Sequence, residues 1–156
     1  NEISCLPLIM QRAADAGLFV AFNAAPMTAA VQAYPLHQVS MFIVNELEGQ
    51  ALTGESAPEQ ILDVMREGYP AAAVILTLGE AGAWYADAHR RIHQASRKVV
   101  AVDTTGAGDT FTGFFLAAWV TGAEPAECLA RGCAAAAICV TRPGAASSIP
   151  EASEVV

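Results

Sequence analysis

The segment "AVDTTGAGDTFTGFFLAAW", residues 101–119, joins a strand-like apolar stretch to an amphipathic helix through a glycine-rich turn that carries an acid. Gly106 and Gly108 have no side chains to block an approaching ligand, and a helix that starts near Ala107 leaves its first N–H groups unpaired. These donors and the helix dipole attract anions, including phosphate. Asp109 therefore suits a proton acceptor that is held beside a phosphate group.

A plainer interpretation of the same turn stays open. Asp109 can be an ordinary N-terminal helix carboxylate, with Thr104 or Thr105 as the capping residue. Two familiar phosphate-binding loops are excluded. The lysine that G-x-x-x-x-G-K-[ST] requires is absent, because the only lysine, Lys98, precedes the turn. Phe111 stands where a dinucleotide-binding G-x-G-x-x-G would need its third glycine.

The composition indicates one soluble globular domain, since 156 residues of which 54% are hydrophobic can bury a sizeable core. The longest apolar runs are too short to span a bilayer, and no N-terminal signal with a basic start is visible. Eight basic and sixteen acidic residues give a net charge of −8, which argues against a nucleic-acid surface. An anionic substrate must therefore be bound by local geometry. We interpret Cys5, Cys128, Cys133 and Cys139 as small buried residues in a reducing cytoplasm, because they lack paired C-x-x-C spacing.

The elements that must position the turn alternate along the chain. A helix is predicted over residues 4–16, a short one that ends at Gly54, and a longer one from Ser56 through Met65. Two more helices are predicted over about 107–121 and about 125–141. Strands are predicted at 18–23, 41–44 and 72–79, and turns and short strands in a hairpin-like arrangement at 82–102. This order predicts an α/β fold, a mostly parallel sheet with helices on both faces, whose ligands lie at the carboxyl ends of the strands.

Polar or glycine-rich residues follow four of these strands: Asn23, Asn45 with Glu48, Thr77 with Gly79, and the turn 106–109. Each also has a structural explanation, with Asn23 as a turn former, Glu48 as a first-turn helix acid, and Gly79 and Gly82 as hairpin glycines. Their convergence on one edge of one sheet favours a functional site.

Several motifs, in order along nearly the whole chain, resemble the ribokinase-like carbohydrate kinases of the phosphofructokinase B family. "VDTTGAGDTFTGFF" is similar to the C-terminal signature of that family, and "NELEGQALTG" to its N-x-x-E segment. "ILTLGEAGAW" resembles its nucleotide-contacting strand and turn, "FNAAP" its N-x-A-P loop, and "VTRPGAASSIP" its closing loop. The resemblance implies ATP-dependent phosphoryl transfer to a hydroxyl of a small sugar, with Mg²⁺ and K⁺.

The resemblance also implies residue roles. Asp109 would be the general base on the sugar hydroxyl and contact the substrate, and Gly106, Ala107 and Gly108 would form the anion hole. Asn45 and Glu48 would organise Mg²⁺ and phosphate through water, as an oxygen-preferring ion allows. The nucleotide site would comprise Asn45, Thr77, Gly79, Gly82 and Gly108. Glu2 is a weaker candidate for the sugar site.

A monovalent cation site is implied beside the anion hole, at Asp103 and Thr105, the carbonyls of Cys139, Arg142 and Gly144, and Ser148. The alternative is that Asp103 caps a turn and the loop merely covers the sheet. One position departs from the family, because Gly132 stands near a point where ribokinase proper often has a polar residue that contacts the nucleotide.

The chain resembles the C-terminal half of such a kinase, without the N-terminal strands and the small β lid. An uncovered sheet edge then predicts association with a second copy or with the missing half. Two function classes stay open: a sugar or nucleoside kinase, or the catalytic half of one, and a non-catalytic nucleotide-binding or assembly module derived from it. The exact sugar cannot be inferred, because its specificity residues lie mostly outside this segment.

Overall fold

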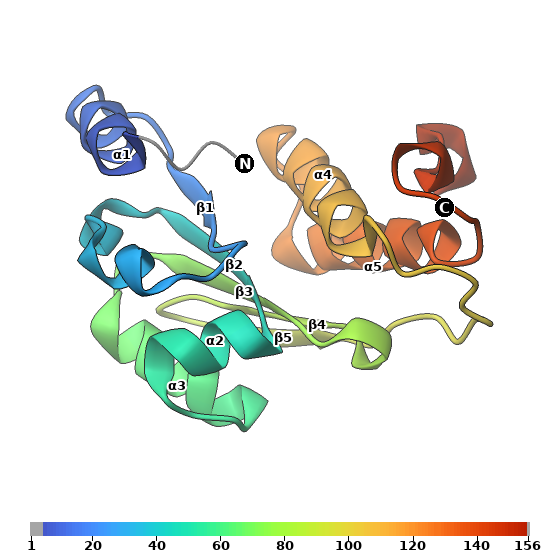
Figure 1. Cartoon of the computed structure of the whole chain (residues 1–156), viewed down its shortest axis with the longest axis horizontal. Helices are drawn as coiled ribbons and strands as arrows, with labels where there is room; N and C mark the ends of the chain where they lie inside the picture. The colour runs from blue at the N-terminus through green and yellow to red at the C-terminus, as the bar shows by residue number, and fades with distance from the viewer. Residues whose placement is uncertain (1–4, 156) are drawn as a thin grey trace. The chain divides into compact units, whose positions relative to one another are not determined.

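The computed structural model describes residues 5–155 (Figure 1). The chain divides into two compact units. The first comprises Asn1–Leu76 and Ala86–Arg91, and the second comprises Thr77–Tyr85 and Ile92–Val156. One five-stranded sheet has the strand order β1-β2-β3-β4-β5. The α/β architecture expected from the sequence is confirmed.

The first unit begins with α1 (Leu6–Asp15), β1 (Ala21–Asn23) and two 3₁₀ turns, η1 (Ala29–Ala33) and η2 (Leu36–Gln38). It continues with β2 (Met41–Asn45), α2 (Glu46–Thr53), α3 (Pro58–Gly68) and most of β3 (Ala73–Thr77). β1 and β2 are parallel, with Phe22 opposite Phe42. The apolar runs of β2 and β3 are buried until their last residue, as expected for central strands of a covered sheet.

The second unit contains η3 (Gly79–Ala81), most of β4 (Ala83–Ala86) and of β5 (Arg91–Gln94), and the helices α4 (Ala107–Val120) and α5 (Pro125–Cys139). Two 3₁₀ turns follow, η4 (Ala146–Ser148) and η5 (Ala152–Glu154). The helices α4 and α5 lie side by side (Figure 1). Phe115 stacks between Phe111 and Trp119, with ring centroids 5.9 and 6.1 Å away, and this aromatic row anchors α4 in the core.

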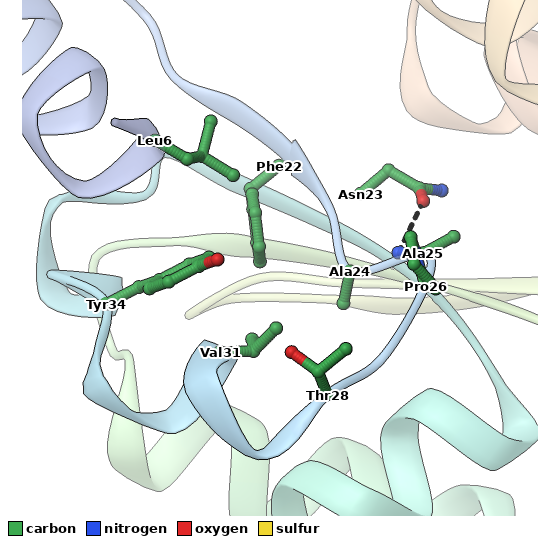
Figure 2. Close-up of a pocket in the computed structure, with 9 residues that line it drawn as sticks. All are labelled: Leu6, Phe22, Asn23, Ala24, Ala25, Pro26, Thr28, Val31 and Tyr34. Atoms are coloured by element: carbon green, nitrogen blue, oxygen red, sulfur yellow. Dashed lines mark hydrogen bonds between the residues drawn. The ribbon is translucent and has the colours of Figure 1, made fainter. Parts of the chain in front are cut away.

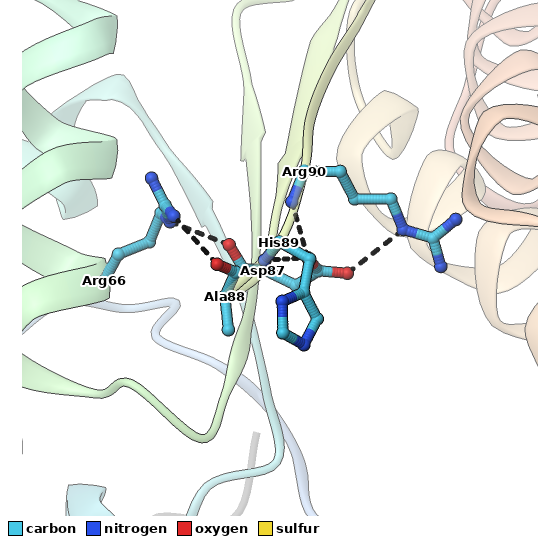
Figure 3. A network of polar contacts seen from close by, with 5 residues as sticks. All are labelled: Arg66, Asp87, Ala88, His89 and Arg90. Carbon is cyan, nitrogen blue, oxygen red and sulfur yellow. Dashed lines mark hydrogen bonds and ion pairs between the residues drawn. The ribbon is translucent and has the colours of Figure 1, made fainter.

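The β4–β5 turn is held by a polar network that the sequence analysis did not anticipate (Figure 3). Within the turn, Asp87 Oδ1 accepts the N–H groups of His89 and Arg90 at 2.8 and 2.9 Å. From α3, Arg66 Nε donates to the carbonyl of Asp87 at 2.7 Å, and its Nη2 donates to the carbonyl of Ala88 at 3.3 Å. These bonds fix a turn whose own side chains are largely exposed.

Three predictions about elements need correction. The strand expected at 18–23 covers only Ala21–Asn23, and Leu18 is 62% exposed, so this apolar stretch is not a fully buried strand. The apolar residues 99–102 belong to no strand, and Val100 is 85% exposed. Cys5 is exposed because it lies at the N-cap of α1, outside the packed part of the helix, whereas Cys128, Cys133 and Cys139 are buried in α5 as predicted.

The glycine at position 132 has a packing explanation. A Cβ built on Gly132 would lie 2.9 Å from ring carbons of Phe111 and 3.1 Å from the Phe111 carbonyl oxygen. The close approach of α5 to α4 therefore leaves no room for a larger side chain at this position.

We expect Gly132→Ala to lower the free energy of unfolding by about 1–3 kcal/mol, because the added methyl overpacks the helix interface. Gly113→Ala is the matched control, since Gly113 is a helical glycine of α4 and nothing lies within 4 Å of a Cβ added there. That substitution should stabilise the chain by about 0.5–1 kcal/mol through helix propensity. Urea unfolding measures both, and equal effects of the two variants would contradict the packing explanation.

Candidate active site

The glycine-rich turn has the geometry of an open helix start. Gly106 precedes α4 with φ 77°, a left-handed conformation that favours glycine, and no side chain caps the helix. Neither Thr104 nor Thr105 caps the helix, so that part of the plainer interpretation is wrong. The N–H of Ala107 donates to the Thr104 carbonyl at 3.2 Å, and that of Thr110 to the Gly106 carbonyl at 2.8 Å.

The N–H groups of Gly108 and Asp109 have no acceptor within residues 5–155. Both belong to the first turn of α4, where unpaired donors and the helix dipole favour an anion. Ala107 was predicted to share the anion hole, yet its own N–H is already engaged by Thr104. Within the described chain, the donors around the helix start that have no acceptor are therefore the N–H groups of Gly106, Gly108 and Asp109.

Asp109 is the third residue of α4 and its side chain is exposed. Among the described residues, its carboxylate forms no hydrogen bond or ion pair. The carboxylate thus contributes no cap to the helix and is accessible to a ligand at the turn. A side chain in this state can accept a proton from a group bound at the helix start.

Asp103 connects the turn to the closing loop, residues 141–150. Its Oδ1 accepts the N–H of Thr105 at 2.9 Å, and its Oδ2 accepts the N–H of Gly144 at 3.0 Å. These bonds, first that from the Thr105 backbone, lower the pKa of the Asp103 carboxyl. Asp103 therefore stabilises this connection fully at pH values above the ordinary pKa of an aspartate. The stabilisation is lost as the pH falls through the lowered pKa of Asp103.

The remaining residues of the predicted cation site lie around the closing loop. The carbonyl of Cys139 accepts the N–H of Arg142 at 3.1 Å, and the guanidinium of Arg142 pairs with Glu154 at 2.5 Å. Ser148 is fully buried, and its hydroxyl donates to the Ala145 carbonyl at 2.6 Å. These bonds hold the loop without a cation. They are consistent with the alternative in which Asp103 caps a turn and the loop merely covers the sheet. The oxygen-rich set still fits a monovalent cation, because carboxylate, carbonyl and hydroxyl oxygens are its ordinary ligands.

Asn45 and Glu48 form a reciprocal capping box at the start of α2, in the first unit. Asn45 Oδ1 accepts the Glu48 N–H and Glu48 Oε2 accepts the Asn45 N–H, both at 2.9 Å. Glu48 is only 6% exposed, and within the described chain its Oε1 has no hydrogen-bond partner. A carboxylate oxygen in this position could accept a hydrogen bond from a water molecule that coordinates Mg²⁺.

The turn after β3 is shaped by two glycines with positive φ, Gly79 at 54° and Gly82 at 99°. Thr77 ends β3 half-buried, and the Leu78 N–H donates to the Gly82 carbonyl at 2.8 Å. His93, which the sequence analysis did not single out, stacks on Trp84 at 4.7 Å between ring centroids. Its Nε2 lies 3.1 Å from the Ala81 carbonyl oxygen, so it supports this turn.

The loop after β1 forms a small, mostly apolar pocket (Figure 2). Asn23 Oδ1 accepts the Ala25 N–H at 2.9 Å, so Asn23 acts here as a turn former. Phe22, Val31 and Tyr34 contribute apolar walls. Glu2, the candidate for the sugar site, lies outside the described residues.

Each unit therefore holds part of the predicted site. The capping box Asn45/Glu48 belongs to the first unit, and the turns at 77–82 and 103–109 and the closing loop belong to the second. Within residues 5–155, no cluster of three or more His, Cys, Asp or Glu side chains could hold a metal ion. None of the helices in this part of the chain combines the length and the apolar character that a membrane span requires.

Comparison with known proteins defines the class. The sequence model of the pfkB family carbohydrate kinase matches residues 6–152, so the chain belongs to the pfkB family of carbohydrate kinases. It is 34% identical to the ribokinase of Haemophilus influenzae over 160 residues, which is 100% of this chain and 52% of the relative.

Two solved structures extend the likeness. Arabidopsis thaliana ribokinase complexed with ribose and ATP has a TM-score of 0.87 and 31% identity, over 96% of this chain and 50% of that structure. An Escherichia coli protein assigned as a ribokinase II, in complex with ATP and Mg²⁺, has a TM-score of 0.81 and 27% identity, over 94% of this chain and 50% of that one. The chain thus spans about half the length of these relatives.

Proposed function

We propose that this chain supplies the phosphoryl-transfer half of an ATP-dependent sugar kinase. The observation that carries the proposal is the first turn of α4, where an unengaged Asp109 carboxylate stands beside the unpaired N–H groups of Gly108 and Asp109. A phosphate acceptor site and a proton acceptor are thereby combined on one rigid helix end. Family membership and the ATP complexes of similar proteins support the same conclusion.

The chemistry follows from these groups. The sugar hydroxyl would give its proton to Asp109 as its oxygen bonds to the γ-phosphorus, and the bond from phosphorus to the bridging oxygen of ADP would break. The backbone donors at 108 and 109 would stabilise the charge that develops on the transferred phosphoryl oxygens. They belong to a helix and need no reorganisation as the reaction proceeds.

Asn45 and Glu48 are the residues that would organise Mg²⁺ through water, and the metal would neutralise phosphate charge when bound. Thr77, Gly79 and Gly82 would line the nucleotide site.

We place the protein in the cytoplasm, because the buried thiols of α5 are all free.

The partner that we propose is the remainder of a pfkB kinase fold. In the first unit, Leu8 and Ile9 of α1 are 50% and 53% exposed, and Leu18, which precedes the end strand β1, is 62% exposed. Apolar side chains beside a sheet edge favour a protein contact. The similar proteins are about twice as long as this chain, which leaves room for such a covering segment.

Residues 1–156 alone should bind ADP or ATP with Mg²⁺ weakly and release no ADP in response to sugars. Positioning of the sugar hydroxyl, which can supply several kcal/mol of the barrier, would come from the rest of the fold. Calorimetry and a coupled ADP assay over a panel of sugars and nucleosides measure both properties. Sugar-dependent turnover should appear once the complementary portion is co-expressed. Nucleotide binding without turnover even then would favour a non-catalytic module.

We further propose that K⁺ binds at Asp103 and the closing loop. Activity of the intact kinase should then be higher in potassium than in sodium at matched ionic strength, because the cation would support the loop beside the anion-binding turn. A large organic cation is the control for ionic strength. Equal rates in all three salts would remove the cation from the mechanism.

A further inference from the structure

Three buried polar side chains form a continuous chain beneath the glycine-rich turn. Thr110 is 2% exposed, and Cys139 and Ser148 are fully buried. Thr110 Oγ1 lies 3.4 Å from Cys139 Sγ, and Cys139 Sγ lies 3.1 Å from Ser148 Oγ. Ser148 Oγ is 2.6 Å from the carbonyl oxygen of Ala145. Each polar atom in this set therefore has a neighbour within hydrogen-bonding reach.

The chemistry of the groups orients these bonds in one direction. A carbonyl oxygen can only accept, so the Ser148 hydroxyl donates to Ala145. The Cys139 S–H can then donate to Ser148 Oγ, while its sulfur accepts the hydroxyl proton of Thr110. The alternative acceptor for the thiol, the Thr105 carbonyl, is 3.9 Å away. We call this arrangement the Thr110–Cys139–Ser148 relay.

The relay joins three segments that are distant in sequence. Thr110 directly follows Asp109 in α4, Cys139 ends α5, and Ser148 belongs to η4 in the closing loop. Ala145, which accepts the last bond, packs against the turn. A Cβ built on Gly106 would lie only 3.6 Å from backbone atoms of Ala145. The middle thiol therefore connects the start of the helix that carries Asp109 to the loop residue that covers Gly106.

Packing alone does not explain the arrangement. Cys133 is another cysteine of α5 and is only 5% exposed, yet its sulfur has a single distant acceptor, the Gln94 carbonyl at 3.9 Å. Buried hydroxyl and thiol groups are costly unless they are paired, so three in contact specify one arrangement of the segments that carry them.

We propose that Cys139 is a positioning residue whose thiol, through Ser148, holds the closing loop against the anion-binding turn. The functional part of this inference, that the held loop favours phosphate binding at the turn, rests on the proposed function. Its structural part does not depend on that function.

Amide hydrogen exchange of residues 1–156 without nucleotide tests the relay. Cys139→Val, which replaces the thiol with methyl groups that cannot hydrogen-bond, should speed exchange of the Gly144, Ser148 and Thr105 amides by about 3- to 10-fold, as the loss of one buried bond implies. Cys139→Ser, which can donate and accept, should restore rates to within about twofold. The control Cys133→Val should leave these amides unchanged.

The proposal would be overturned if these amides exchanged in Cys139→Val at the rates of the parental chain. It would also be overturned if Cys133→Val accelerated their exchange equally. If Cys139→Val does not fold, Thr110→Val breaks the other end of the relay and is judged by the same amides. ADP affinity, measured by calorimetry, should fall in Cys139→Val and recover in Cys139→Ser. Unchanged affinity with a loosened loop would contradict the positioning role, whereas a parental chain that binds no ADP would contradict the proposed function and leave the exchange result to decide the relay.

Discussion

Asp109→Asn should lower phosphoryl transfer by the intact kinase by about two to four orders of magnitude while nucleotide binding stays close to that of the parent. The amide keeps the shape of the side chain but cannot accept the proton of the sugar hydroxyl. Because Asp109 has no hydrogen bond or ion pair within the described residues, the substitution breaks no contact that holds the helix. The loss should therefore appear in kcat, with little change in the melting temperature.

Glu127→Gln is a matched control for that experiment. Glu127 is the third residue of α5, as Asp109 is of α4, so both substitutions remove one charge from the first turn of a helix. Glu127 pairs with Arg131 on the exposed surface, and its loss should cost at most about 1 kcal/mol of stability. A large loss of activity in both variants would mean that general electrostatics, and not proton transfer by Asp109, explains the effect.

The elements with a strong local pattern could be predicted from the sequence. The buried run of β3 and the amphipathic helix α3, which begins at Pro58 within "SAPEQ", lie close to their predicted places. The stretch 18–23 was predicted as a longer strand because its residues are apolar, but whether such residues pair in a sheet depends on partners elsewhere in the fold. The same reason explains residues 99–102.

The candidate site could be predicted less completely. Motif spacing located Asp109 and the helix start, but it left open whether Thr104 or Thr105 caps the helix, which depends on the conformation of Gly106. His93 was missed because its contact with the Ala81 carbonyl joins residues twelve apart across a hairpin. The relay was missed for a related reason: Cys139 looks like one more small residue of an alanine-rich helix until Thr110 and Ser148 are seen around it.

The turn after β3 should tolerate no side chain at Gly82. Its φ of 99° and ψ of −137° lie in a region that essentially only glycine occupies. A Cβ there would lie 2.0 Å from the Gln94 carbonyl oxygen and 2.7 Å from the Ser96 backbone nitrogen, which are backbone atoms that cannot rotate away. The hairpin between β4 and β5 would have to open to accommodate even one methyl group.

We therefore expect Gly82→Ala to lower the free energy of unfolding by more than about 4 kcal/mol, which combines a glycine-only conformation with a backbone clash. Gly79→Ala, three residues earlier in the same turn, is the control. Gly79 also has a positive φ, 54°, but nothing lies within 4 Å of an added Cβ. Its substitution should cost about 1–2 kcal/mol, the usual penalty for a left-handed residue. Urea unfolding of both variants separates the two contributions. A Gly82→Ala chain as stable as Gly79→Ala would show that the hairpin approaches the turn less closely than the structure has it, and would remove the steric reason for glycine beside the proposed nucleotide site.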